Sequence, residues 1–119
     1  MVMMFRQDSL EETNEKPSLF VVDLELKKHA WHPYINTMEA EQELTGKPAF
    51  TYLTRPCEYD RGFMISFVNR DGHIKHDHFT LANAKFGIWR NGHPSHIGKL
   101  EKVLRDMMDC GLSEGQPLN

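Results

Sequence analysis

The chain of 119 residues lacks several features that mark large classes of proteins. Its two cysteines, Cys57 and Cys110, are too few for a disulfide framework, which favours a reducing compartment. No apolar run approaches the roughly 18 residues of a membrane-spanning helix. The apolar start, residues 1–5, is followed by acidic residues where a signal peptide would continue its apolar core. These absences predict a soluble, cytoplasmic protein that is not bound to a membrane.

The chain also has no excess of positive charge. Its formal net charge is −3 and its isoelectric point is near 6.1, which argues against nucleic-acid binding through bulk electrostatics. A local basic pocket stays compatible with this balance, because net charge says nothing about distribution. The length, the 39% hydrophobic content and the 26% charged content are typical of one globular domain. We expect a monomer without nucleic-acid partners.

Catalytic motifs are missing as well. The sequence contains no glycine-rich phosphate loop, and no nucleophile-elbow glycines surround Ser66 or Ser95. Cys57 is not part of a cysteine-hydrolase pattern. We therefore expect a protein that is not an enzyme, with no catalytic residues, cofactor or metal.

Hydrophobic periodicity divides the chain into a polar extension, residues 1–17, and a domain, residues 18–119. Alternation of Val22, Leu24 and Leu26 with charged residues predicts a strand over 18–26. Asn36 and Glu39 have the spacing of a capping box. They predict a helix that ends near Leu44, stops at Gly46, and uses Met38, Ala40 and Leu44 as apolar contacts.

Three strand-like runs follow, over residues 50–55, 63–68 and 73–81, and Asp71-Gly72 predicts a hairpin between the last two. A fourth short strand is expected over 86–89. A second helix is expected after the N-cap Ser95, before Gly111, with an apolar stripe of Ile97, Leu100, Val103, Leu104 and Met107. The predicted fold class is α+β, a central antiparallel sheet flanked by two helices.

Arg55 is an unusual residue in this pattern. Alternation places it on the same strand face as Thr51 and Leu53, where an unpaired charge would be costly. It precedes a turn-rich loop, residues 56–62, whose backbone amides could bind an anion together with the guanidinium. An arginine at a strand end is more often a surface residue or an ion-pair partner, so the pattern alone leaves an anion site as a hypothesis.

His76 and His78 share a face of the third predicted strand, because they are two residues apart. Such a pair can bind a metal, and Cys57 or another histidine could complete the site. Seven histidines in a small domain make chance pairs common, and no paired metal-binding motif supports this alternative. A small metal-dependent enzyme is therefore the second hypothesis.

The order of these features over residues 31–108 resembles the Src homology 2 (SH2) domain family. Tyr52-Leu53-Thr54-Arg55 stands where that family has a phenylalanine-leucine-valine-arginine signature. The matching features are Trp31, Glu39-Ala40-Glu41, Gly62-Phe63, Ile65-Ser66-Phe67, Lys75-His76, Phe79, Leu100 and Val103-Leu104.

The resemblance implies a phosphotyrosine-binding adaptor or effector in tyrosine-kinase signalling, with tyrosine-phosphorylated proteins or peptides as partners. Arg55 would pair with the phosphate, and Asp77 and Trp89 would contact the residues that follow the phosphotyrosine. The expected phosphotyrosine-binding set is Thr37, Arg55, Cys57, Glu58, Tyr59, Arg61, His76 and His78.

Two positions depart from the family pattern. Thr37 or Met38 stands where the first helix often carries a second phosphate-binding arginine, and Pro56-Cys57 replaces a glutamate-serine pair. A thiol is a weak hydrogen-bond donor, so Cys57 replaces a hydroxyl poorly. These departures keep a third hypothesis open, an SH2-like scaffold that has lost phosphate binding. They also fit an effector that a pathogen delivers into the host cytoplasm.

Overall fold

The structure is a computed structural model, and it describes residues 22–91, 97–111 and 114–118. The predicted extension 1–17, the predicted N-cap Ser95 and the start of the predicted first strand lie outside these ranges. In the described part of the chain, no helix has the length and apolar character needed to cross a bilayer.

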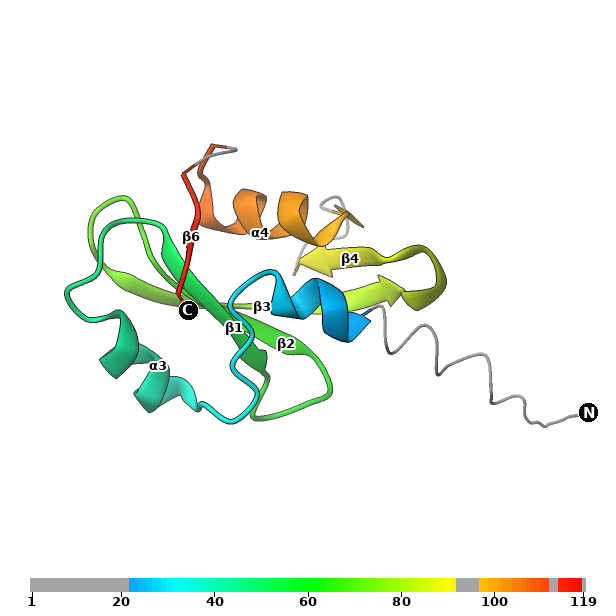
Figure 1. Ribbon diagram of the computed structural model, residues 1–119, viewed down its shortest axis with the longest axis horizontal. Coiled ribbons are helices and arrows are strands. Elements are labelled where there is room, and N and C mark those ends of the chain that lie inside the picture. The colour runs from blue at the N-terminus through cyan, green and yellow to red at the C-terminus, as the bar shows by residue number, and fades with distance from the viewer. Residues whose placement is uncertain (1–21, 92–96, 112–113, 119) are drawn as a thin grey trace, which may run out of the picture.

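A six-stranded sheet forms the centre of the domain (Figure 1). Its strand order is β5-β4-β3-β2-β1-β6, and neighbours pair antiparallel except for β6, which runs parallel to β1. The strands are β1 Thr51–Pro56, β2 Phe63–Val68, β3 Ile74–Asn83, β4 Ile88–Asn91, β5 Ile97–Gly98 and β6 Gln116–Pro117. The three long predicted strands are thus confirmed to within two residues, and the hairpin between β2 and β3 forms at Asp71-Gly72 as predicted.

Two helices lie on opposite faces of the sheet: α3, Thr37–Leu44, and α4, Leu100–Met108 (Figure 1). The capping box of α3 is confirmed, because Asn36 accepts from the Glu39 N–H while the Glu39 carboxylate accepts from the Asn36 N–H. A short 3-10 helix, Ala84–Phe86, precedes β4. The predicted α+β class, with helices flanking an antiparallel sheet, is correct.

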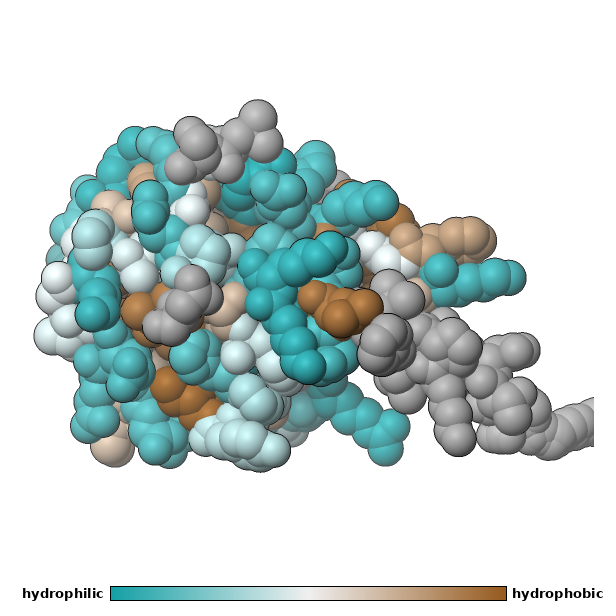
Figure 2. Space-filling view, viewed as in Figure 1, coloured by the Kyte–Doolittle hydropathy of each residue, from teal (hydrophilic) through white to brown (hydrophobic). Residues whose placement is uncertain are grey.

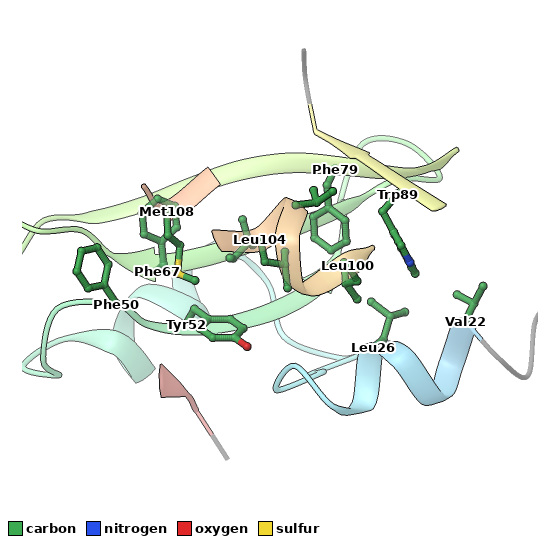
Figure 3. Close-up of a cluster of buried hydrophobic side chains, with 12 residues drawn as sticks. Val22, Leu26, Phe50, Tyr52, Phe67, Phe79, Trp89, Leu100, Leu104 and Met108 are labelled. Carbon is green, nitrogen blue, oxygen red and sulfur yellow. The ribbon is translucent and has the colours of Figure 1, made fainter. Parts of the chain in front are cut away.

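Each face of the sheet has its own apolar cluster. The larger cluster lies under α4 and contains aromatic side chains from β1 to β4 (Figure 3). The smaller cluster lies under α3 and contains Ala30, Ala40, Leu44, Leu53 and Val68. On the face shown in Figure 2, the surface is mainly hydrophilic and the hydrophobic side chains form small separate patches.

The predicted strand over 18–26 is wrong in its described part, because residues 22–27 are helical. Val22 and Leu26, four residues apart, are buried in the larger cluster (Figure 3), whereas Leu24 is 45% exposed. Apolar residues at every second position contain a pair four residues apart, so this short segment fits either period. Packing of one helical face against the core decides for the helix.

Three smaller predictions about the helices and β4 need correction. Helix α4 begins at Leu100, and Ile97 belongs to β5 and is exposed. Met38 is 69% exposed, so only Ala40 and Leu44 of α3 reach the core. The short fourth strand is Ile88–Asn91, two residues later than predicted, because Asn83 caps a 3-10 turn before it.

Candidate anion-binding site

Arg55 lies near the end of β1 and is fully buried, with 0% of its surface exposed. Leu53, two residues earlier on the same strand face, packs in the cluster under α3. The alternation inferred from the sequence is therefore correct, and it directs Arg55 toward the N-terminal end of α3. A buried guanidinium needs acceptors for its N–H groups, because removing it from water is costly.

Four side chains bond to the Arg55 guanidinium, with His76 Nδ1 the most distant at 3.4 Å from Nη2. Its Nε–H donates to Ser66 Oγ on β2 at 3.0 Å, and Nη2 donates to Thr37 Oγ1 at 3.0 Å. Nη1 contacts Glu58 Oε1 in the β1–β2 loop at 3.3 Å. Ser66 thus bonds to the inner nitrogen, Nε, of the guanidinium, while α3 and the β1–β2 loop supply partners for its two outer nitrogens.

Glu58 supplies the negative charge in this arrangement. The hydrogen bond from the Thr37 hydroxyl and the charge of Arg55 hold the pKa of the Glu58 carboxyl below its ordinary value of 4.5. Its side chain is 36% exposed, whereas that of Arg55 is 1% exposed. An exposed loop carboxylate therefore pairs with a buried positive charge.

His76 on β3 links this site to α3. The β2–β3 register places His76 opposite Ser66, and its Nδ1 lies 2.8 Å from Ser66 Oγ. Ser66 Oγ accepts from Arg55, so its own proton is available for Nδ1. With Nδ1 as acceptor, the imidazole carries a proton on Nε2, which donates to Glu41 Oε2 at 2.8 Å. The network runs continuously from Arg55 through Ser66 and His76 to Glu41.

A second group of side chains lies in the β1–β2 loop and on β3. One ligand atom each of Cys57, Asp60 and His78 lies within 4.8 Å of the other two. His78 Nε2 is 3.2 Å from Asp60 Oδ1, which also accepts from the Gly62 N–H at 2.7 Å. These two bonds, with that from Gly62 the stronger, hold the pKa of the Asp60 carboxyl below its ordinary value of 3.8.

The predicted phosphotyrosine-binding residues are therefore divided among different environments. Thr37, Glu58 and His76 bond to Arg55 or lie against it, with His76 Nδ1 at 3.4 Å from Nη2. Cys57 and His78 belong to the group around Asp60. Tyr59 is 91% exposed, and the exposed Arg61 makes no hydrogen bond or ion pair with the described residues.

The two predicted specificity residues also differ from each other. Asp77 is exposed and points to the sheet face opposite to His76, as strand alternation requires. Trp89 is fully buried among Phe63, Phe79 and the residues of α4 (Figure 3). Its predicted contact with a peptide is therefore wrong for this structure, because a core residue presents no surface to a ligand.

Ser66, Glu41 and Asp60 were not predicted as site residues. Ser66 had a detectable signal: it is the one hydroxyl residue in the apolar run 63–68, and its position in β2 puts it on the face of Arg55. Glu41 and Asp60 had none, because acidic residues on an exposed helix and in a loop are common. Only the packing of α3 and the loop against β3 brings their carboxylates to the histidines.

Comparison with known proteins supports the fold. No family model matches the chain, and no curated protein is significantly similar in sequence. Among solved structures, it is similar to the VAV1 SH2 domain, determined in solution with a tyrosine-phosphorylated peptide from SLP76. The TM-score is 0.55 and the identity 16%, over 100% of this chain and 85% of that one. The chain therefore has an SH2-like fold.

Proposed function

We propose that this protein is a phosphotyrosine-binding module in which Arg55 pairs with the phosphate. The observation that carries the proposal is a fully buried guanidinium whose charge partner is an exposed loop carboxylate. A site that holds one oxyanion in this way is suited to another. A phosphate has about −1.5 to −2 charges near pH 7 and more acceptor oxygens than Glu58 offers.

The contacts of Arg55 suggest how the exchange occurs. Ser66 keeps the Nε–H bonded, so the plane of the guanidinium stays in place when the ligand changes. Phosphate displaces the Glu58 carboxylate and accepts from Nη1 and Nη2, in the bidentate geometry that arginine favours. The Thr37 hydroxyl donates to the phosphate in place of Glu58.

Depth and charge set the selectivity that we propose. An arginine on the floor of a pocket is reached by the long side chain of phosphotyrosine and not by phosphoserine. Asp77, exposed on the neighbouring surface, disfavours acidic residues directly after the phosphotyrosine. The module acts by occupying phosphorylated sites as an adaptor or effector in the cytoplasm, with no catalytic step of its own.

Titration of a phosphotyrosine peptide against wild type and Arg55→Ala tests the proposal. Loss of Arg55 is expected to cost about 2–5 kcal/mol of binding free energy, because the phosphate loses its main partner. Against a typical micromolar affinity of about −8 kcal/mol, useful binding disappears. Arg90→Ala, at an exposed arginine on β4, is the matched control and keeps wild-type affinity. Equal binding of the unphosphorylated peptide, or binding that survives Arg55→Ala, contradicts the proposal.

One observation favours the alternative of a scaffold that has lost phosphate binding. The Glu58 carboxylate already neutralises Arg55, and Glu41 adds a second carboxylate behind His76. If phosphate does not displace these carboxylates, the same titration detects no phosphate-dependent binding to wild type. A metal enzyme that uses His76 and His78 together is less favoured, since His76 bonds to Ser66 and Glu41.

A further inference from the structure

Three side chains with different metal-ligating atoms meet at the β1–β2 loop. Cys57 brings a sulfur, Asp60 a carboxylate oxygen and His78 an imidazole nitrogen, all within 4.8 Å of one another. In the described part of the chain, no other group of three such side chains comes this close. We propose that Cys57, Asp60 and His78 form a binding site for a divalent transition-metal cation of the zinc class.

The donor set indicates which cations fit. Thiolate sulfur, imidazole nitrogen and carboxylate oxygen are the three protein ligands of zinc, and borderline-soft ions such as Co²⁺ accept the same set. Magnesium and calcium prefer sites built from oxygen atoms alone, so a thiolate and an imidazole disfavour them. The combination of these donors therefore selects for a transition metal over the hard cations.

The loop holds its two ligands in position before a cation arrives. The Cys57 N–H donates to the Gly62 carbonyl at 3.0 Å, which closes the loop, and the Gly62 N–H donates to Asp60 Oδ1 at 2.7 Å. His78 comes from β3, a central strand of the sheet. The site therefore needs only small side-chain movements to contract around an ion.

Gly62 makes the approach of His78 possible. A Cβ at this position would lie 2.3 Å from His78 Nε2 and 3.0 Å from Asp60 Oδ1. Any other residue would push the imidazole edge away from the carboxylate. The glycine at the end of the loop thus clears the space in which Nε2 and the carboxylate face each other.

Proton balance accounts for the arrangement without a cation. His78 Nε2 bonds to the Asp60 carboxylate, and the Cys57 sulfur lies within 4.8 Å of both ligand atoms. When the cation binds, the thiol proton goes to solvent. The proton that Nε2 shares with Asp60 also leaves to solvent and the ring proton is then carried on Nδ1, so that Nε2 offers its lone pair. The thiolate and the carboxylate then balance the two positive charges of the ion.

The site is open to solvent, with the side chains of Asp60 and His78 57% and 38% exposed. Three protein ligands leave one position of a tetrahedral zinc ion for water or another ligand. His78 lies on the same face of β3 as His76, so the cation would stand beside the Arg55 site. The inference does not depend on the proposed phosphotyrosine binding, because it uses none of the contacts of Arg55.

Titration of the fully reduced protein with Co²⁺ tests the site, because a cobalt–thiolate bond produces a charge-transfer absorption band. Wild type is expected to show this band with one equivalent bound, and added Zn²⁺ is expected to abolish it. Cys57→Ser loses the band. Asp60→Asn and His78→Gln weaken Co²⁺ binding by more than about tenfold.

Three matched controls each change a residue of the same type outside the site and keep wild-type Co²⁺ binding: Cys110→Ser, Asp71→Asn and His73→Gln.

Two results would overturn the proposal: no cobalt–thiolate band in reduced wild type, or a band that persists in Cys57→Ser and disappears in Cys110→Ser.

A measurement of thermal stability tests the site in variants that fold poorly. Zn²⁺ stabilises only a protein whose folded state binds it, so it raises the Tm of wild type and not that of Cys57→Ser or Asp60→Asn. Equal stabilisation of all variants would place the ion elsewhere. Arg55→Ala keeps the cobalt band, which separates this test from that of phosphotyrosine binding.

Discussion

The two faces of the sheet use the same strands for different purposes. Under α4, Phe79, Trp89 and Leu100 fill an apolar core whose stability comes from buried surface. Under α3, the same sheet carries Arg55 and Ser66 fully buried in a polar network. Buried polar groups contribute little net stability and leave high costs when one partner is missing. The comparison indicates that the α4 face stabilises the domain, whereas the α3 face carries the buried polar groups of the proposed binding site.

The largest effect on stability is expected on the α4 face. Trp89→Ala removes a fully buried ring that packs against Phe63 and Phe79, so the free energy of unfolding falls by about 3–5 kcal/mol. Urea denaturation measures this change in the free energy of unfolding. Phe86→Ala, at an aromatic residue that is 65% exposed, is the control and stays close to wild type. A small loss in Trp89→Ala would mean that the α4 face is not the main source of stability.

Arg55→Met tests the α3 face, where we expect binding and not stability to change. Loss of one partner of an ion pair is costly when the other charge stays buried, but the Glu58 side chain is 36% exposed and is hydrated when left alone. We therefore expect a free energy of unfolding close to that of wild type, together with loss of phosphopeptide binding. Denaturation and titration of one sample measure both. Destabilisation as large as that of Trp89→Ala would show that Arg55 is a structural residue.

Glu58→Gln is expected to strengthen phosphopeptide binding. It removes the negative charge that pairs with Arg55 and keeps the shape of the side chain. Because Glu58 is an exposed ion-pair partner, the gain is modest, about two- to fivefold in affinity. Glu43→Gln, at an exposed residue of α3, makes the same change in net charge and serves as the control. Weaker binding in Glu58→Gln would mean that this carboxylate supports the ligand instead of competing with it.

The smallest effect is a pH dependence at His29, which contacts the Tyr52 hydroxyl at 2.9 Å at the margin of the α4 face. Burial lowers the pKa of His29 below its ordinary value of 6.5. The unfolded chain therefore binds the proton more readily, so stability is complete above pH 6.5 and declines as the pH falls through the folded-state pKa. Denaturation between pH 8 and pH 5 measures this slope. The slope becomes shallower in His29→Asn and stays unchanged in the control His73→Asn.

Local patterns were sufficient for much of the fold. The capping box of Asn36 and Glu39, the turn at Asp71-Gly72 and the three long strands depend on residues close together in the sequence, and all were predicted correctly. The helix over 22–27 was missed, because its apolar spacing satisfies two periods and only burial of Val22 and Leu26 selects one. Trp89 was misplaced for a related reason, since sequence does not reveal which side of a strand as short as β4 faces the core.

The sequence by itself determined that Arg55 lies on an apolar strand face, since strand side chains alternate regardless of their surroundings. Only the tertiary structure decided what the arginine meets there. The register of β2 and β3 aligned Ser66 with His76, and the docking of α3 and the loop brought Thr37 and Glu58 to the guanidinium. The same docking joined Cys57 and Asp60 to His78. Contacts between residues far apart in the chain depend on how elements pack, and no local spacing encodes them.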